Sequence, residues 1–272
     1  MPSIALISSD LKHWLKDLVD RARHRAVPVL PSRVPVRRIK RLIAKRGLAL
    51  INGRPSWFYT AYYRSDPLTH FTLQKIVETL PKSAAILNTG CGTGIMLFWL
   101  LDQGFETVEG FDYLPECVAV ADEVRTIGGY ETRIWKDDGF DPTLTRSYDL
   151  ITAMHWVFSA WGGNYGNAAA VNPRDPDTRE RLLRELLSKY AGHLNPDGRM
   201  IIELTDAVAD RRAPNDHPYI QDGAQSIYPV RHSPEQVARA AAAVGLEIEH
   251  SYLSVSYGHQ PRTSYWLRKR AA

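Results

Sequence analysis

Short apolar segments alternate with amphipathic helical patterns along most of this 272-residue chain. A helix between two strands returns the chain to the starting edge of a sheet, so the alternation predicts parallel strands with helices on both faces. Only the polar sequence GHQPR separates the last two apolar segments, which must therefore pair antiparallel. We predict an α/β fold with a doubly wound, mostly parallel seven-stranded sheet and one antiparallel strand near the C-terminal end. The expected strands are residues 84–88, 107–112, 130–135, 148–153, 199–204, 246–257 and 263–269, with helices at 69–80, 94–101, 115–127, 178–190 and 233–245 and a tight turn at 195–198.

The first 65 residues differ from the rest in charge. Twelve Lys or Arg and no Asp or Glu lie between Arg21 and Arg64, although the net charge of the whole chain is only +4. Apolar residues at helical spacing predict an amphipathic helix at 10–26, and a second, basic helix is expected at 36–46. We therefore predict a basic helical N-terminal extension or cap, residues 1–65, and a main domain, residues 66–272.

A basic segment suits an anionic partner such as phosphate, acidic lipid headgroups or nucleic acid, and a solvated arm is the alternative. One expectation is therefore peripheral contact with an anionic membrane surface through residues 10–46; packing of the first helix on the body, or against another subunit, is the other. The chain has no apolar run of about 18 residues, the length that crosses a bilayer. Its first ten residues do not resemble a secretory signal, and two cysteines are too few for a disulfide framework. We expect a cytoplasmic protein, and the oligomeric state stays open.

The segment Asn88-Thr89-Gly90-Cys91-Gly92-Thr93-Gly94 lies between the first expected strand of the main domain and its helix. Glycines there let the backbone turn sharply and approach a ligand, and the helix start offers free N–H groups. The segment is neither a dinucleotide fingerprint, since residue 95 is Ile, nor a Walker loop, since Gly-Lys-Ser/Thr is missing. Asp112 ends the next strand, where a carboxylate accepts hydrogen bonds from ribose hydroxyls.

The segments ILNTGCGTG, VEGFDYLPE, KDDGF, YDLITAMHWVF and HLNPDGRMIIEL together resemble the class I S-adenosylmethionine-dependent methyltransferase family. The resemblance covers about residues 84–204, extends to 270 through the last helix and hairpin, and implies a Rossmann-like fold with S-adenosyl-L-methionine as cofactor. It implies that the glycine segment passes the methionine and ribose, that Asp112 binds the ribose, and that the segment after 136 binds adenine. The implied cofactor-binding residues are Asn88, Gly90, Cys91, Gly92, Gly94, Asp112, Tyr113 (or Leu114), Asp138 (or Asp137), Gly139, Phe140 and His155.

Asn88 departs from the family pattern, which usually has an acidic residue at this position. An amide can still hydrogen-bond the loop or the cofactor ammonium, but it cannot pair with its charge. We expect cofactor binding to survive, weakened.

His155 follows the fourth expected strand, where the resemblance places the meeting point of cofactor and substrate. It is our candidate catalytic base, because histidine accepts a proton near neutral pH. The alternative is a histidine that only closes the pocket through hydrogen bonds. Trp156 and Trp161 either flank the substrate or belong to the core. Tyr59, Tyr62 and Tyr63 either fold over the cofactor cleft or form a docking patch.

Two long polar loops, residues 159–177 and 205–233, are the expected specificity elements. In the second, Tyr219 and Arg231 are candidates for binding a polar substrate. The acidic and histidine residues there match no metal template, so we predict no metal site.

These features predict a methyltransferase that methylates an oxygen of a small molecule, such as a sugar unit or a secondary metabolite. The Asn/Asp-Pro-Pro-Tyr/Phe signature of nucleobase amino methylation is missing, since the chain reads Ala153-Met154-His155-Trp156. Nothing resembles an RNA-binding module, although an RNA-directed methyltransferase remains an alternative. A binding or scaffold protein that has lost catalysis is the other.

Overall fold

The computed structural model of the chain describes Arg41, Lys45 and residues 49–50, 54–55, 67–161, 176–206, 230–254 and 262–270. Its helices are α4 (Pro67–Thr79), α5 (Ile95–Asp102), α6 (Pro115–Gly128), α7 (Val157–Trp161), α8 (Pro176–Ala191) and α9 (Pro234–Ala242). Its strands are β1 (Ala49–Leu50), β2 (Arg54–Pro55), β3 (Ala85–Thr89), β4 (Thr107–Asp112), β5 (Ile134–Lys136), β6 (Tyr148–Ala153), β7 (Leu194–Asp206), β8 (Arg231–His232), β9 (Leu246–Ser254) and β10 (Arg262–Lys269).

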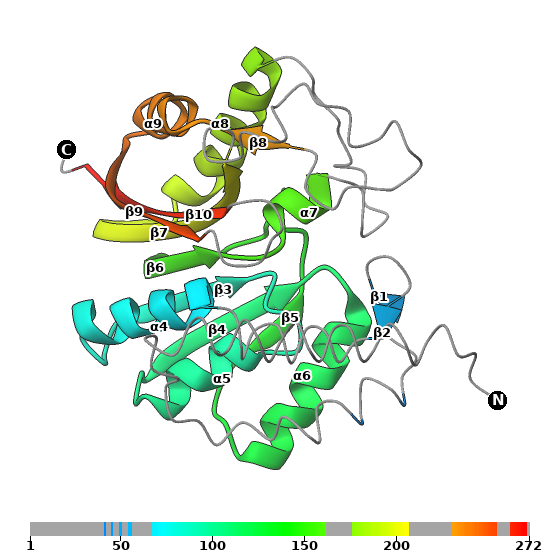
Figure 1. Cartoon of the computed structure of the whole chain (residues 1–272). Coiled ribbons are helices and arrows are strands. Elements are labelled where there is room, and N and C mark those ends of the chain that lie inside the picture. Colours follow the sequence, from blue (N-terminus) through cyan, green and yellow to red (C-terminus); the bar gives the residue numbers. More distant parts are fainter. Residues whose placement is uncertain are drawn as a thin grey trace.

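The main sheet has the strand order β5-β4-β3-β6-β7-β10-β9. Strands β3 to β7 pair in parallel, whereas β10 pairs antiparallel with both β7 and β9. The short β8 adds to β7 in parallel and makes the sheet eight-stranded. Helices α5 and α6 cover one face, and α8 and α9 cover the other (Figure 1). The predicted doubly wound, mostly parallel sheet with one antiparallel strand is confirmed.

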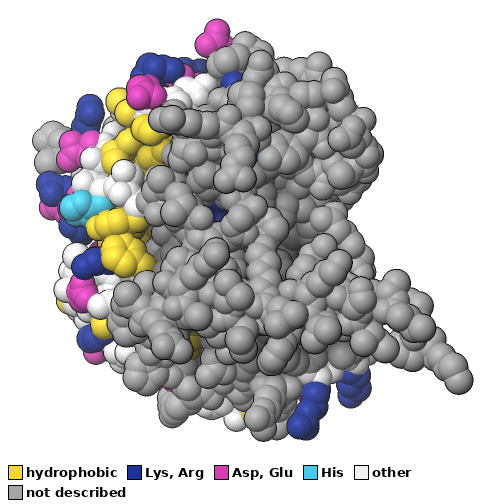
Figure 2. All heavy atoms as spheres, viewed as in Figure 1, with side chains coloured by type: hydrophobic (Ala, Val, Ile, Leu, Met, Phe, Trp, Pro, Cys, Tyr) yellow, Lys and Arg dark blue, Asp and Glu magenta, His cyan; other side chains and the backbone are white. Residues whose placement is uncertain are grey.

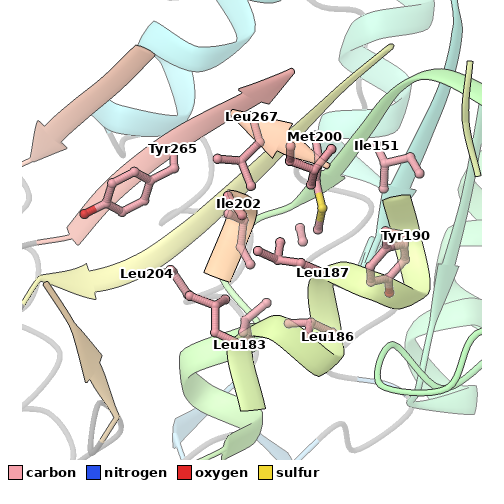
Figure 3. Packing of buried hydrophobic residues seen from close by; sticks show 14 of the residues in the cluster. Ile151, Leu183, Leu186, Leu187, Tyr190, Met200, Ile202, Leu204, Tyr265 and Leu267 are labelled. Atoms are coloured by element: carbon pink, nitrogen blue, oxygen red, sulfur yellow. The ribbon is translucent and has the colours of Figure 1, made fainter. Parts of the chain in front are cut away.

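Successive residues of the central strands face opposite sides of the sheet and build two separate cores. Ile86, Leu150 and Ile201 join the core that includes α4, α5 and α6. Their neighbours in sequence, Leu87, Ile151 and Ile202, join the core that includes α8 and α9. Figure 3 shows the second core, where Leu183, Leu186, Leu187 and Tyr190 of α8 lie against Met200, Ile202, Leu204, Tyr265 and Leu267 of the sheet. Burial on both faces explains why the strands are almost continuously apolar.

Several boundaries differ from the sequence expectation. Strand β5 begins at Ile134 rather than at 130. The turn expected at 195–198 lies inside β7 as a bulge, where the pairing with β6 slips between Tyr148 and Leu150 and Asp197 adopts φ 60°. Both long loops are shorter than expected, because α7 runs to Trp161 and β8 pairs with the end of β7.

The N-terminal region also contains the antiparallel pair β1–β2, which we had not expected in a helical extension. Its sequence signal is Asn52-Gly53 between the strands, a dipeptide typical of hairpin turns. Arg41 and Lys45 are helical and exposed, as expected for the helix at 36–46. The predicted helix at 10–26 lies outside the described residues. No helix in the described part of the chain has the length and apolar character needed to span a bilayer. On the flank visible in Figure 2, side chains of both charge signs are interspersed with hydrophobic ones.

Candidate cofactor and methyl-transfer site

The glycine segment leaves β3 as a tight loop whose three glycines all have positive φ. The angles are 61° at Gly90, 56° at Gly92 and 79° at Gly94, a region that side chains with a Cβ rarely adopt. The backbone N–H of Cys91 donates to Phe111 O of β4 at 2.8 Å, so the loop lies against the end of the neighbouring strand. The close approach also requires Gly110, because a Cβ there would lie 3.0 Å from Asn88 O.

Asp112 ends β4 and holds this loop. Its Oδ2 accepts a hydrogen bond from Gly92 N at 2.7 Å, and its Oδ1 accepts one from Leu114 N at 2.9 Å. Burial raises the pKa of this carboxyl to about 6, although the backbone hydrogen bonds from Leu114, Gly92 and Tyr113 oppose the rise. Each carboxylate oxygen has a second lone pair, so Asp112 can hold the loop and still accept hydrogen bonds from a ligand.

The loop after β5 distinguishes the two candidate aspartates. Asp137 uses Oδ1 for the N–H of Asp138 at 2.9 Å, and its Oδ2 accepts from Trp135 Nε1 at 3.2 Å and from both N and Oγ1 of Thr143 at 3.0 Å. Asp138 uses Oδ1 for the N–H of Phe140 at 2.9 Å. Asp137 therefore stabilises the loop with its whole carboxylate, which favours Asp138 as the adenine ligand; that assignment stays a prediction.

The indole of Trp156 lies between Gly90 and Gly139, two of the four glycines that the resemblance assigned to the cofactor. A Cβ at residue 90 would lie 2.3 Å from its Cδ1, and a Cβ at residue 139 would lie 2.5 Å from its Cη2. The indole Nε1 donates to Thr89 Oγ1 at 3.1 Å. The hydroxyl of buried Tyr190 donates to Gly139 O at 2.6 Å and holds that loop from α8. Trp156 therefore lies as a wall between the two loops expected to bind the cofactor, residues 90–94 and 137–140, which we call the cofactor loops.

His155 adopts φ 68°, an unusual backbone conformation for a residue with a Cβ, and its side chain is buried. Its Nε2 lies 2.6 Å from Thr69 Oγ1 of α4. Its Nδ1 lies 3.0 Å from Glu203 Oε2 of β7 and 3.1 Å from an Arg262 guanidinium nitrogen of β10. Glu203 also accepts from the backbone N–H of His155 at 2.9 Å. Both ring nitrogens thus contact protein groups, an arrangement that favours the pocket-closing alternative over the catalytic base.

The remaining candidates lie in different places. Asn88 is buried, and its Oδ1 accepts from Thr152 Oγ1 at 3.2 Å. Tyr113 follows Asp112 and is 38% exposed. Trp161 belongs to the core, where it contacts the rings of Phe140 and His232, which favours the core alternative for this residue. Arg231 is buried in β8. Tyr59, Tyr62, Tyr63 and Tyr219 lie outside the described residues.

Sequence reasoning missed Glu203, Arg262 and Thr69. Glu203 was detectable as a lone carboxylate in the apolar strand RMIIEL, since an acid that is fully buried requires a partner. Arg262 and Thr69 carry no comparable signal, because only the tertiary structure brings the starts of β10 and α4 to the end of β6. In the described residues, no group of three His, Cys, Asp or Glu is placed to hold a metal ion.

The residues at the ends of β3, β4 and β5 fit an adenosyl cofactor. An added Cβ would lie 2.3 Å from Trp156 at Gly90 and 2.6 Å from Phe98 at Gly94, so this tight loop requires glycine at both positions. A buried carboxylate, Asp112, lies beside it at the carboxyl edge of the sheet, where α/β folds bind ligands. The family model described as a methyltransferase domain matches residues 60–251. The chain belongs to this methyltransferase family.

Curated relatives of this methyltransferase domain act on different substrates. A dTDP-3-amino-3,6-dideoxy-alpha-D-glucopyranose N,N-dimethyltransferase from Streptomyces fradiae is 30% identical over 123 residues, which are 45% of this chain and 40% of the relative. A ribosomal RNA small subunit methyltransferase C from Alcanivorax borkumensis is 26% identical over 140 residues, 50% of this chain and 35% of the relative. The matches therefore span less than half the length of these relatives.

Among solved structures, the magnesium protoporphyrin IX methyltransferase from Synechocystis with bound SAH has a TM-score of 0.56 at 14% identity. The match covers 84% of this chain and 94% of that protein, and it supports the shared fold. The predicted family is confirmed, and with it the enzyme class and the S-adenosylmethionine cofactor that characterise the family.

Proposed function

We propose that this chain transfers a methyl group from S-adenosylmethionine to a small polar molecule, with a sugar unit or a secondary metabolite as the acceptor class. The main support for the proposal is the hydrogen bond from Gly92 N to Asp112 Oδ2, because it places a buried carboxylate directly beside the glycine loop. Asp112 would bind the ribose hydroxyls, the loop from Gly90 to Gly94 would accommodate the methionine part, and Asp138 would bind the adenine amino group.

S-adenosylmethionine, when bound, supplies an electrophilic methyl group on a sulfonium that is already a good leaving group. The protein therefore has to orient the acceptor, exclude water and, for a hydroxyl acceptor, remove one proton. Trp156 and Phe140, whose ring centroids lie 5.2 Å apart, would exclude water at the cofactor loops.

Oxygen is the acceptor atom that we propose first. His155 would be its base if a substrate hydroxyl replaced Thr69 Oγ1 as the partner of Nε2. Two observations favour an amino nitrogen as the second candidate. The Streptomyces fradiae relative is named for methylation of an amino sugar, and His155 Nε2 already contacts Thr69 at 2.6 Å. A neutral amine has a lone pair available for methyl transfer and depends less on a base than a hydroxyl does.

Calorimetry with S-adenosylhomocysteine tests the cofactor part of the proposal, and absence of binding would contradict it. Transfer of a radiolabelled methyl group to a panel of hydroxyl and amino sugar nucleotides, to small phenols and to RNA then tests the acceptor. Labelling only of RNA would favour the RNA-directed alternative. Cofactor binding without transfer to any acceptor class would favour a scaffold protein.

We also propose that the basic N-terminal segment, residues 10–46, contacts anionic membrane surfaces. Ten of the twelve basic residues in the stretch without a carboxylate from Arg21 to Arg64 lie in this segment and support the proposal. Deletion of residues 1–46 should abolish co-sedimentation with vesicles that contain phosphatidylserine and leave cofactor binding intact. Equal sedimentation of the two proteins would contradict it.

A further inference from the structure

We infer that Glu203 is a positioning residue for methyl transfer, which acts on the cofactor loops through His155 and Trp156. The inference rests on the proposed function and adds a role for a residue of β7 that touches neither of the cofactor loops in the described contacts. It follows from three linked observations on the carboxyl edge of the sheet.

The first observation is the backbone conformation at the end of β6. His155 has φ 68°, and a Cβ makes this conformation unfavourable. Such a residue persists only where its surroundings hold it. Glu203 supplies that restraint with one oxygen, since Oε2 accepts from His155 N at 2.9 Å and lies 3.0 Å from His155 Nδ1.

The second observation concerns the charge of Glu203. Its side chain is fully buried in β7, where an unpaired carboxylate would be strongly unfavourable. A guanidinium nitrogen of Arg262 lies 2.5 Å from Oε1, so the ion pair keeps Oε2 directed at His155. Glu203 is opposite Ser264 in the ladder and Arg262 is opposite Thr205, so the pair bridges neighbouring strands on one side of the sheet.

The third observation is the consequence of the turn at His155 for the next residue. The left-handed turn directs Trp156 back across the glycine loop, where its five-membered ring lies against Gly90 and its six-membered ring lies against Gly139. The indole therefore sets the separation of the two loops proposed to bind opposite ends of the cofactor. Glu203 holds His155, His155 directs Trp156, and Trp156 spaces the loops.

The test compares Glu203→Gln with a matched control, Glu249→Gln. Glu249 also pairs with an arginine across strands of this sheet, at 2.7 Å from Arg199, but the described contacts connect it to none of the site residues. In the E203Q variant, the Kd for S-adenosylhomocysteine should rise about tenfold or more, by analogy with residues that orient the ligands of a metal site. In E249Q the Kd should stay within about twofold, since a change at a distant pair seldom propagates.

A spectroscopic readout separates positioning from a general loss of stability. With 5-fluorotryptophan incorporated, the resonance missing from a Trp156→Phe variant reports on the Trp156 indole. E203Q should shift or broaden that resonance and E249Q should not. If E203Q does not fold, the Glu203→Asp variant replaces it in the same measurements. Its shorter side chain keeps a carboxylate near Arg262 but moves that carboxylate away from His155.

Rescue by glycine tests the backbone step itself. Glycine adopts φ 68° without a Cβ penalty, so His155→Gly in the E203Q background should recover most of the lost cofactor affinity. Unchanged affinity and an unshifted Trp156 resonance in E203Q, or a double variant that binds no better than E203Q, would overturn the inference. Failure of the unmodified protein to bind S-adenosylhomocysteine would instead contradict the proposed function.

Discussion

At the scale of single residues, the site depends on backbone conformations that most side chains avoid. Gly90 and His155 both have positive φ, and both determine where the Trp156 indole lies. Glycine adopts its angle freely, whereas His155 is held by Glu203. The two positions therefore respond differently to substitution.

Gly90→Ala should abolish cofactor binding rather than merely lower stability. A Cβ there would lie 2.3 Å from Trp156 Cδ1 and would displace the indole. Gly129→Ala is the matched control, since Gly129 has a similar φ of 65° and nothing lies within 4 Å of an added Cβ. We expect G129A to lose about 1–2 kcal/mol of stability from backbone strain alone and to bind S-adenosylhomocysteine normally. Calorimetry and thermal melts measure both effects, and normal binding by G90A would contradict the geometry.

The raised pKa of Asp112 predicts that cofactor binding depends on pH. Because burial raises this pKa to about 6, the carboxyl gains a proton as the pH falls through that value and loses its capacity to accept two ribose hydrogen bonds. We expect the Kd for S-adenosylhomocysteine to rise as the pH is lowered from 7 to 5, by up to about tenfold per pH unit below the pKa. The Asp112→Asn variant should bind S-adenosylhomocysteine weakly, with a Kd that does not change over this pH range. A constant Kd in the unmodified protein between pH 5 and 7 would contradict the assignment.

At the scale of elements, local sequence signals place the helix starts. Pro115 occupies the first turn of α6, and Gly129 ends that helix in a left-handed conformation. Helix α9 starts with a capping box, in which Ser233 Oγ accepts from Gln236 N at 3.3 Å and Gln236 Oε1 accepts from Ser233 N at 3.0 Å.

Ser233→Ala should destabilise the protein by about 1 kcal/mol, because it leaves a helix N–H without its side-chain acceptor. For a domain of this size the melting temperature should fall by about 2–4 °C, with unchanged cofactor affinity. The control is Ser188→Ala, since the hydroxyl of Ser188 only donates to Glu185 O on an exposed helix surface. Equal melting temperatures for S233A and S188A would contradict the contribution of the cap.

At the scale of the whole molecule, the buried groups of Asp112 and His232 have opposite effects on folding stability as the pH falls. The pKa of Asp112 is raised to about 6, so the folded state binds this proton before the unfolded state and gains stability as the pH falls below 6. Burial lowers the pKa of His232 to about 4, so the unfolded state binds that proton first. The stability that the neutral, buried His232 contributes is fully present above about pH 6.5 and is lost as the pH falls towards 4.

His232→Gln should therefore reduce the acid sensitivity of folding. Gln keeps an amide donor for Arg179 O, which His232 Nε2 contacts at 3.2 Å, but it does not titrate. We expect a lower urea midpoint than for the unmodified protein at pH 7, from lost packing, and a smaller decrease between pH 7 and pH 5. In the Asp112→Asn variant, the urea midpoint should instead decrease more between pH 7 and pH 5 than in the unmodified protein. Parallel pH profiles for the unmodified protein and H232Q would contradict the buried, neutral histidine.

The sequence by itself determined the succession of strands along the chain, their parallel or antiparallel direction, the helix starts and the glycine loop with Asp112. Each follows from residues near one another in the chain: apolar runs, caps, and backbone angles that only glycine adopts freely. The error at residues 195–198 has the same origin, because Asn-Pro-Asp-Gly has the local preference of a turn and pairing with β6 overrode it.

Only the tertiary structure decided the roles of Trp156, His155 and Glu203. Trp156 lies against residues 66 and 17 positions away in sequence, Gly90 and Gly139, and His155 meets Glu203, Arg262 and Thr69 from three other elements. These contacts depend on strand register and on which end of each element reaches the carboxyl edge of the sheet. Nothing in a local pattern encodes that placement, because burial and charge pairing act between segments that are adjacent only after the chain has folded.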